Sequence, residues 1–361
     1  MIACYRCGRV YPHDSVPYRC PDCGGVFGFQ QMPIFDLGLV EKDQPGLWRY
    51  RHTFGLPDDS PVVTLGEGDT PLVWAQALGR EIAFKLDYLN PTASFKDRAS
   101  ALLVSFLLAR RVEQTVEDSS GNAGASYAAY AAHAGIRARI YVPGYASGPK
   151  RAQIEAYGAE VVAVPGPRSQ AARAVREAAD QGAVYASHAY LPQGSPGFAT
   201  IAYELVEQIG AAPGALIAPV GHGSLMLGVG RGFKELLNAG LIERMPQLIG
   251  VQAAACAPLA ATFNGNPIGE DGLSEGETHA EGVRIVHPLQ TDVLLDLIES
   301  SQGFFVTVEE GDILPGRDHL ARLGFYVEPT SAIVWSALEQ VSGQVPEPIV
   351  VILTGSGLKH G

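Results

Sequence analysis

Short apolar segments alternate with helix-period segments along most of this chain, and this alternation restricts its fold more than any other feature. Apolar runs such as 160–164, 215–219 and 304–308 are each followed by a segment whose apolar residues recur at three- and four-residue spacing. Repeated strand–helix units place their strands parallel in a sheet with helices on its faces. The sequence therefore predicts an α/β fold of parallel-rich, twisted sheets flanked by helices.

The individual elements follow from the same periodicity. Strands are predicted at 82–86, 115–118, 138–142, 160–164, 184–186, 215–219, 248–252, 304–308 and 349–353. Helices are predicted at 99–109, 125–134, 148–157, 169–181, 200–209, 225–238, 291–300, 312–323 and 328–341. Residues 29–60 lack a clear period and predict an irregular arm.

Composition limits the partners and the compartment. The chain has 361 residues, of which 47% are hydrophobic, so it can bury a large core and divide into more than one domain. A formal net charge of -12 disfavours nucleic acid as a partner. The sequence shows neither a signal peptide nor an apolar run of bilayer length, so we expect no membrane partner and a cytoplasmic location.

Lys96 lies at the turn between a predicted strand and a predicted helix, within the segment Asn90–Arg98. Ser94 is the predicted N-cap of that helix, and Asp97 favours the positive end of its dipole. A lysine held there and partly desolvated can act as a nucleophile towards an aldehyde. The alternative is an ordinary surface lysine.

Two turns rich in glycine and serine each lead from a predicted strand into a helix, and Thr354 follows the last predicted strand. Backbone amides at a helix N-terminus favour anions, so a carboxylate or a phosphate suits the first turn and a phosphate suits the second. The first turn alone would also be compatible with a plain strand–helix connection. The turns comprise Ser119, Ser120, Gly121, Asn122, Ala123 and Gly124, and Gly221, His222, Gly223, Ser224 and Leu225.

Four cysteines form two Cys-x-x-Cys pairs near the N-terminus, namely Cys4, Cys7, Cys20 and Cys23. Two such pairs can surround one tetrahedral zinc ion, and four thiolates leave no open position, so the metal would be structural. Iron bound by the same four cysteines is the alternative to zinc. Two disulfides are disfavoured in a reducing compartment, and a redox pair is disfavoured within one short, loop-rich module.

The lysine, the two turns and Thr354 all follow predicted strands, where an α/β sheet exposes groups to a ligand. A single cofactor that combines an aldehyde, a phosphate, a phenolic oxygen and a ring nitrogen would engage all of them. Pyridoxal 5'-phosphate has this combination.

Five motifs carry a resemblance to a known family across nearly the whole chain. They are P-T-A-S-F-K-D-R at 91–98, S-S-G-N-A-G at 119–124, P-V-G-H-G-S at 219–224, E-P-T-S-A at 328–332 and L-T-G-S-G-L-K at 353–359. The chain thereby resembles the fold-type II pyridoxal-phosphate enzymes of the tryptophan synthase β superfamily. Within them it is most similar to threonine synthases and threonine synthase-like proteins, many of which carry an N-terminal Cys-x-x-Cys ribbon.

The resemblance implies a role for each motif. Lys96 would form the Schiff base with the cofactor, Asn122 would bond the phenolic oxygen, and Thr354 would face the ring nitrogen. The phosphate would be held by Gly221, His222, Gly223, Ser224 and Leu225. The substrate carboxylate would be held by Ser119, Ser120, Gly121 and Ala123.

The resemblance also implies domains and an assembly. The expected parts are a zinc ribbon at 1–28, an arm at 29–60, a large cofactor-binding domain at 61–104 and 196–361, and a small mobile domain at 105–195. A homodimer is expected from the family alone.

The implied reaction is that of threonine synthase, in which O-phospho-L-homoserine and water give L-threonine and phosphate. Two departures bear on the substrate: Ala123 stands where threonine synthases usually have threonine, and residues 187–198 contain no Lys or Arg. Lys150, Arg151 and Lys359 are then the candidate cations for a substrate phosphate. The alternatives are an ammonia-lyase acting on threonine or serine, a β-replacement enzyme, and a non-catalytic zinc-ribbon binding protein.

Overall fold

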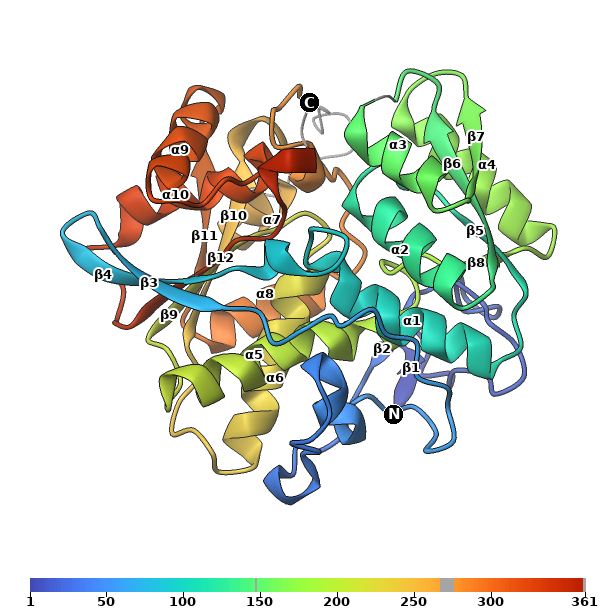
Figure 1. Ribbon diagram of the computed structural model, residues 1–361, viewed down its shortest axis with the longest axis horizontal. Helices are drawn as coiled ribbons and strands as arrows, with labels where there is room; N and C mark the ends of the chain where they lie inside the picture. The colour runs from blue at the N-terminus through green and yellow to red at the C-terminus, as the bar shows by residue number, and fades with distance from the viewer. Residues whose placement is uncertain (147, 267–275, 360–361) are drawn as a thin grey trace. The chain divides into compact units, whose positions relative to one another are not determined.

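Two compact units make up the computed structural model of the chain, which describes residues 1–146, 148–266 and 276–359 (Figure 1). The first unit contains residues 1–68 and 90–197, and the second contains 69–89 and 198–359. The chain therefore passes into the second unit, returns to the first, and enters the second again. None of the helices in the described part of the chain combines the length and hydropathy needed to cross a membrane.

The first unit is built on a four-stranded parallel sheet, as the alternating pattern predicted. Its order is β7 (Glu160–Val164), β6 (Arg137–Pro143), β5 (Gln114–Glu117) and β8 (Val184–Tyr185). The helices of this unit are α1 (Lys96–Ala109), α2 (Asn122–His133), α3 (Pro149–Ala156) and α4 (Arg168–Asp180). Ala125 and Ala128 of α2 pack against Ile140 of β6 and Ile154 of α3, because small side chains let this helix approach the sheet closely.

The N-terminal segment packs within the first unit. Strands β1 (Ile2–Cys4) and β2 (Phe27–Phe29) pair antiparallel and form the ribbon. Tyr11 of the ribbon meets the ring of Phe106 of α1 at a centroid distance of 6.2 Å, and Tyr18 meets Tyr185 and Tyr190 at 5.4 Å each. Arg110, after α1, donates to the carbonyl of Pro12 at 3.2 Å. Aromatic edges and a guanidinium thus fix the ribbon on this unit.

The arm after the ribbon contains only 3₁₀ turns among its regular elements, at Leu37–Leu39 and Gly46–Thr53, in agreement with its lack of a period. The buried carboxylate of Glu67 accepts from Trp48 Nε1 at 2.9 Å and from the hydroxyl of Tyr130 at 2.7 Å. Tyr130 belongs to α2, so one side chain connects the arm to the sheet-covering helix.

The second unit contains a six-stranded sheet. Its order is β11 (Phe304–Val308), β10 (Gln247–Ala253), β9 (Ala215–Pro219), β12 (Ile349–Ile352), β4 (Arg80–Lys85) and β3 (Leu72–Ala77). Neighbouring strands are parallel except β3 and β4, which pair antiparallel. Strand β3 was not predicted from the sequence. Its turn to β4 consists of Leu78 and Gly79, both with positive φ, which is the geometry of a tight hairpin.

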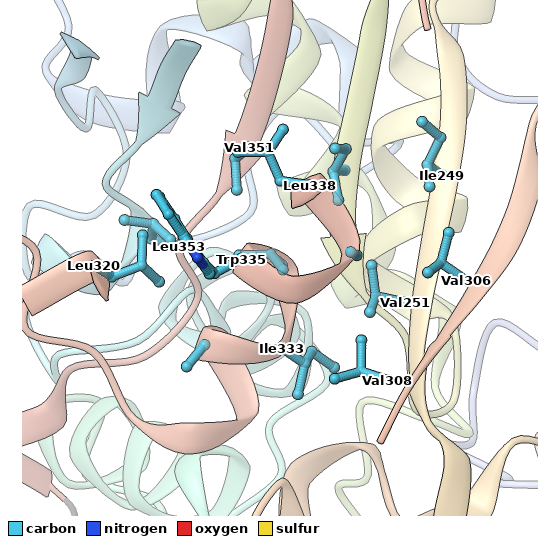
Figure 2. Close-up of a cluster of buried hydrophobic side chains, with 14 of the residues drawn as sticks. Ile249, Val251, Val306, Val308, Leu320, Ile333, Trp335, Leu338, Val351 and Leu353 are labelled. Atoms are coloured by element: carbon cyan, nitrogen blue, oxygen red, sulfur yellow. The ribbon is translucent and has the colours of Figure 1, made fainter. Parts of the chain in front are cut away.

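Helices cover both faces of the six-stranded sheet. They are α5 (Ser195–Ile209), α6 (Ser224–Asn238), α7 (Pro258–Phe263), α8 (Thr291–Ser300), α9 (Glu310–Arg322) and α10 (Pro329–Val341). Figure 2 shows Ile333 and Leu338 of α10 in the cluster that also contains Val251 and Val306 of the strands. Leu248, the neighbour of Ile249 in β10, lies against Gly230 of α6, and successive strand residues point to opposite faces.

The structure corrects one local prediction and leaves the domain prediction open. Ser94 is not the N-cap of α1: Phe95 occupies that position, and the Ser94 hydroxyl finds no hydrogen-bond partner among the described residues.

Residues 90–104 group with the first compact unit and not with 198–359. The resemblance also implies that the small domain moves relative to the large one. The division into these two domains stays a prediction.

A buried ion pair lies beneath β4 in the second unit. Lys85 Nζ is 2.7 Å from Glu204 Oε2 of α5, and both side chains are fully buried. The ammonium also donates to the carbonyl of Thr70 at 2.8 Å and to Gln208 at 2.9 Å, while Asp69 N–H donates to Glu204. Full hydrogen bonding offsets much of the desolvation cost of such a pair.

We predict that Glu204→Gln destabilises the protein, because it leaves the Lys85 charge buried without its counter-ion. The free energy of unfolding should fall by about 3–5 kcal/mol, measured by urea denaturation. Arg139→Met is the matched control: it breaks an exposed pair with Glu160 at 2.9 Å and should change the same quantity by less than about 1 kcal/mol. Equal effects in the two variants would contradict the assignment.

Candidate active site and metal centre

Lys96 is the first residue of α1, and its amine has a close partner. Lys96 Nζ lies 2.6 Å from His188 Nε2 and 4.7 Å from the centroid of the Phe95 ring. His188 follows β8 in a turn closed by bonds from Tyr190 N–H and Leu191 N–H to the carbonyl of Ser187. The amine is therefore held at a strand-to-helix turn, as the sequence predicted, and against an imidazole.

The turn before Lys96 is held by the carboxylate of Asp97. This side chain accepts from the backbone N–H of Thr92 at 2.6 Å, from the Thr92 hydroxyl, and from the hydroxyl of Ser126 at 2.6 Å. Asp97 is fully buried, so each of these bonds acts in a medium of low dielectric constant. Ala93, between the bonded positions, has a φ of 63°, which an alanine adopts only where its surroundings enforce it.

The turn 119–124 joins β5 to α2, which begins at Asn122. Gly121 N–H donates to the Ser119 hydroxyl at 3.2 Å. A Cβ at Gly124 would lie 1.9 Å from the Ser119 carbonyl oxygen, so only glycine permits this close return of the chain. The first-turn amides of α2 have no acceptor within the helix, which makes this turn suitable for a carboxylate.

Glu117, the last residue of β5, lies directly behind this turn. Its carboxylate accepts from the N–H of Ser119 at 2.5 Å, and the side chain is buried. Burial raises the pKa of Glu117 from 4.5 to about 8, and the adjacent Asp118 adds to this rise. The Ser119 amide, Arg168 and Lys96 act in the opposite direction. Glu117 is thus a neutral acid near pH 7, next to the predicted carboxylate turn.

The second predicted turn lies in the second unit, between β9 and α6. Gly223 occupies the N-cap position of α6 with a φ of 83°, and its carbonyl accepts from Leu227 N–H at 2.8 Å. A Cβ at Gly221 would lie 2.9 Å from the carbonyl oxygen of Gly282. The backbone is therefore closely packed on one side, and the amides at the start of α6 form the kind of cradle that binds phosphate.

Thr354 follows β12 in the same unit and is buried. Its N–H donates to the Ser331 hydroxyl at 2.9 Å, near the start of α10. The neighbouring Thr330 hydroxyl accepts from Gly282 N–H at 3.0 Å, and Gly282 is the residue that packs on Gly221. Consecutive residues of α10 therefore connect Thr354 with the turn 221–225.

The structure brings the predicted residues together in two groups, one in each unit. The first unit holds Lys96, Asn122 and the carboxylate turn, and Ser126 of α2 bonds the same Asp97 that fixes the lysine turn. The second unit holds the turn 221–225 and Thr354. Of the candidate cations, Arg151 pairs with Glu155 at 2.9 Å, whereas Lys359 is buried.

The four N-terminal cysteines form a third site. Their sulfur atoms all lie within 4.8 Å of one another, with Cys4 to Cys23 at 3.5 Å and Cys7 to Cys20 at 3.6 Å. A tetrahedral zinc with Zn–S bonds of about 2.3 Å requires sulfur separations of about 3.8 Å. A disulfide requires about 2.0 Å, and all five cysteines of the chain are free. The geometry matches a four-sulfur metal site and excludes the disulfide alternative.

Backbone amides complete this centre. The backbone amides of Arg6 and Cys7 act to lower the thiol pKa of Cys4, that of Arg9 the pKa of Cys7, and that of Gly25 the pKa of Cys23. Amides near the sulfurs favour the thiolate form that a metal requires. Gly25 has no room for a side chain, because its Cβ would lie 2.8 Å from the Cys4 sulfur.

Sequence reasoning missed two functional candidates, His188 and Glu117. His188 lies in the segment 187–198, which contains no Lys or Arg. Its only sequence signal is its place shortly after a strand. Glu117 ends a strand directly before the carboxylate turn, and its raised pKa depends on burial that sequence spacing does not reveal.

Comparisons with known proteins agree with this geometry. A family model described as "Pyridoxal-phosphate dependent enzyme" matches residues 63–355. The threonine synthase of Methanocaldococcus jannaschii is 33% identical over 99% of this chain and 92% of its own. That of Synechocystis sp. is 36% identical over 89% of this chain and 83% of its own. The structure of maize serine racemase superposes with a TM-score of 0.70 at 22% identity, over 80% of this chain and 88% of its own.

We predict that Glu117→Gln raises the free energy of unfolding in a pH-dependent way. In the wild type the folded state binds a proton on Glu117 that the unfolded state loses above about pH 4.5, so stability declines from there to about pH 8. Glutamine lacks this titration. The difference between variant and wild type should grow with pH, to on the order of a few kcal/mol, in urea denaturation at several pH values.

Glu113→Gln, at an exposed position in the same segment, is the matched control and should show no such trend. A stability difference for Glu117→Gln that stays constant between pH 5 and 8.5 would show that Glu117 titrates normally.

We predict that the purified chain carries about one zinc or iron ion, since four sulfurs complete one tetrahedral site. Cys20→Ser should lose most of the metal, measured by elemental mass spectrometry. Cys256→Ser, which replaces the buried fifth cysteine in the second unit, should keep it. Retention of full metal content by Cys20→Ser would rule out the four-cysteine site.

Proposed function

Because the chain belongs to the family of pyridoxal-phosphate-dependent enzymes, we propose that it is a lyase that converts O-phospho-L-homoserine and water to L-threonine and phosphate. The observation that carries the proposal is the match to threonine synthases. The M. jannaschii enzyme aligns with 99% of the chain, and the two chains are of similar extent. A match of this length includes the ribbon segment and both groups of predicted site residues.

The residues present are suited to the cofactor. When bound, pyridoxal phosphate supplies an aldehyde that holds an amino group and a ring that withdraws electrons from the α-carbon of an amino acid. Lys96 offers an amine beside an imidazole, and the turn 221–225 offers amides at the start of α6. Gly221 and Gly124 pack closely against neighbouring backbone, so neither position has room for a side chain.

In this proposal Lys96 holds the cofactor and, once the substrate replaces it, takes and returns protons at the α- and β-carbons of the substrate. Phosphate leaves the γ-carbon, and water adds at the β-carbon. The hydroxyls of Ser119 and Ser120 and the first amides of α2, from Asn122 and Ala123, hold the substrate carboxylate. The neutral Glu117 behind them adds no negative charge that would repel it.

Two further residues would set the electronic state of the cofactor. Asn122 would donate to its phenolic oxygen, and Thr354 would face its ring nitrogen. A hydroxyl, unlike a carboxylate, does not force that nitrogen to be protonated. The ring then withdraws electrons less strongly, which favours chemistry at the β- and γ-carbons over transamination.

An ammonia-lyase or a β-replacement enzyme is the second candidate. The absence of Lys and Arg from residues 187–198 favours it, because a substrate phosphate needs cationic partners. For the first candidate, Arg151 could supply a cationic partner. Its ion pair with Glu155 is partly exposed, so breaking that pair to bind a phosphate would cost little free energy.

We predict that the purified protein with bound cofactor releases phosphate and threonine in equal amounts from phosphohomoserine. It should form no 2-oxobutyrate from threonine. Phosphate is measured colorimetrically and 2-oxobutyrate with lactate dehydrogenase. If phosphohomoserine releases no phosphate while threonine yields 2-oxobutyrate, the result would favour the ammonia-lyase.

The role of the amine is tested by substitution. Lys96→Ala should lower kcat on the order of a thousandfold or more, since it removes both the covalent attachment and the proton carrier. It should also lose the yellow absorbance of the lysine-bound cofactor. Lys42→Ala, at an exposed lysine of the arm, is the control and should retain both.

A further inference from the structure

The imidazole of His188 has no part in the reaction as described so far. Its Nε2 lies 2.6 Å from Lys96 Nζ, which is a short hydrogen bond between two groups that can both carry a positive charge. Two cations at this distance repel each other strongly, so the pair holds one positive charge between them. Either the ammonium of Lys96 donates to a neutral imidazole, or a protonated imidazole donates to a neutral amine.

The charges that surround the pair favour this sharing. Lys96 acts on the carboxyl of Glu117, which also interacts with Asp118 and with Arg168 of α4. The Asp118 carboxylate accepts from the hydroxyl of Tyr185 at 2.6 Å. Burial raises the pKa of Glu117 to about 8, so near pH 7 this carboxyl is mostly neutral. It therefore does not balance a second positive charge on the pair.

The structure fixes the position of the imidazole through the turn that carries it. Ala186 N–H donates to Val116 of β5 at 2.9 Å, and Leu191 N–H closes the turn on the Ser187 carbonyl at 2.8 Å. On the far side of the turn, Arg19 of the ribbon donates to the Tyr190 hydroxyl at 3.2 Å and lies over its ring. The turn that carries His188 is thus anchored on both sides before any ligand arrives.

We propose that His188 is a positioning residue that accepts the proton of the Lys96 ammonium, so that the amine can attack an aldehyde, and returns the proton when the amine is released. The proton moves from Nζ to Nε2. The neutral Nζ would then bond to the aldehyde carbon, and the aldehyde oxygen would leave as water. The inference rests on the proposed function, because it needs Lys96 as the amine that holds the cofactor.

The experiment measures how fast Lys96 reacts with the cofactor, not how fast the enzyme turns over. Full-length protein freed of cofactor is mixed with pyridoxal 5'-phosphate at pH values from 5.5 to 9. The adduct is reduced with borohydride at set times, and peptide mass spectrometry quantifies modified Lys96. In the wild type the rate should rise with pH through a titration of the Lys96–His188 pair, because only a neutral imidazole accepts the proton.

His188→Gln keeps a polar side chain but does not titrate. At pH 8 it should form the Lys96 adduct at least about tenfold more slowly than the wild type, and the titration that the imidazole contributes should disappear. In His188→Ala, added imidazole should restore part of the lost rate, which a merely structural role would not permit. His133→Gln, at an exposed histidine at the end of α2, is the control and should behave as the wild type.

The outcomes separate the two proposals. A wild type in which Lys96 is not modified would overturn the proposed function. A wild type modified at Lys96, with the same rate and pH dependence in His188→Gln, would overturn the role of His188 and leave the proposed function standing. If His188→Ala does not fold, as judged by circular dichroism, the comparison with His188→Gln decides the matter alone.

Discussion

The buried carboxylate of Asp97 is the constraint on which the first half of the candidate site depends. It binds the backbone and hydroxyl of Thr92 on one side and Ser126 of α2 on the other. Three donors on one buried carboxylate stabilise its charge and define the turn in which Lys96 begins α1. The strained φ of Ala93 persists because this set of bonds enforces it. The same side chain connects the lysine turn with the helix that starts at Asn122.

Most of the fold could be predicted from the sequence, because apolar periodicity determines which segments are buried strands and which are amphipathic helices. Strand β3 was not predicted because it is an edge strand that is only half buried. It pairs antiparallel with β4, so no crossover helix between the two strands marks it in the sequence. The Leu78–Gly79 turn was the one available clue. Ser94 looked like a helix cap by residue type, but the buried turn is organised by Asp97 instead.

The candidate site was predictable where a motif keeps its residues adjacent in the chain, as in the two turns and the Cys-x-x-Cys pairs. It was not predictable where contacts depend on distant segments. Lys96 and His188 are separated by 92 positions and meet only in the folded chain, where the turn after β8 reaches the start of α1. Glu117 is a glutamate of ordinary appearance whose chemistry is set by burial. The local sequence specifies the turns and the metal ligands, whereas the chemistry of a pair such as Lys96 and His188 depends on the tertiary structure.

The ribbon makes a contribution that its length does not suggest. Its Tyr11 and Tyr18 edges cover Phe106, Tyr185 and Tyr190, and Arg19 holds the turn that follows β8. Removing the first 28 residues would therefore uncover the rings of Phe106, Tyr185 and Tyr190 on the first unit, with the aggregation hazard that exposed aromatic side chains carry. The cysteine module is thus not a detachable appendage, and any shortened form of this enzyme would need a replacement for that covering layer.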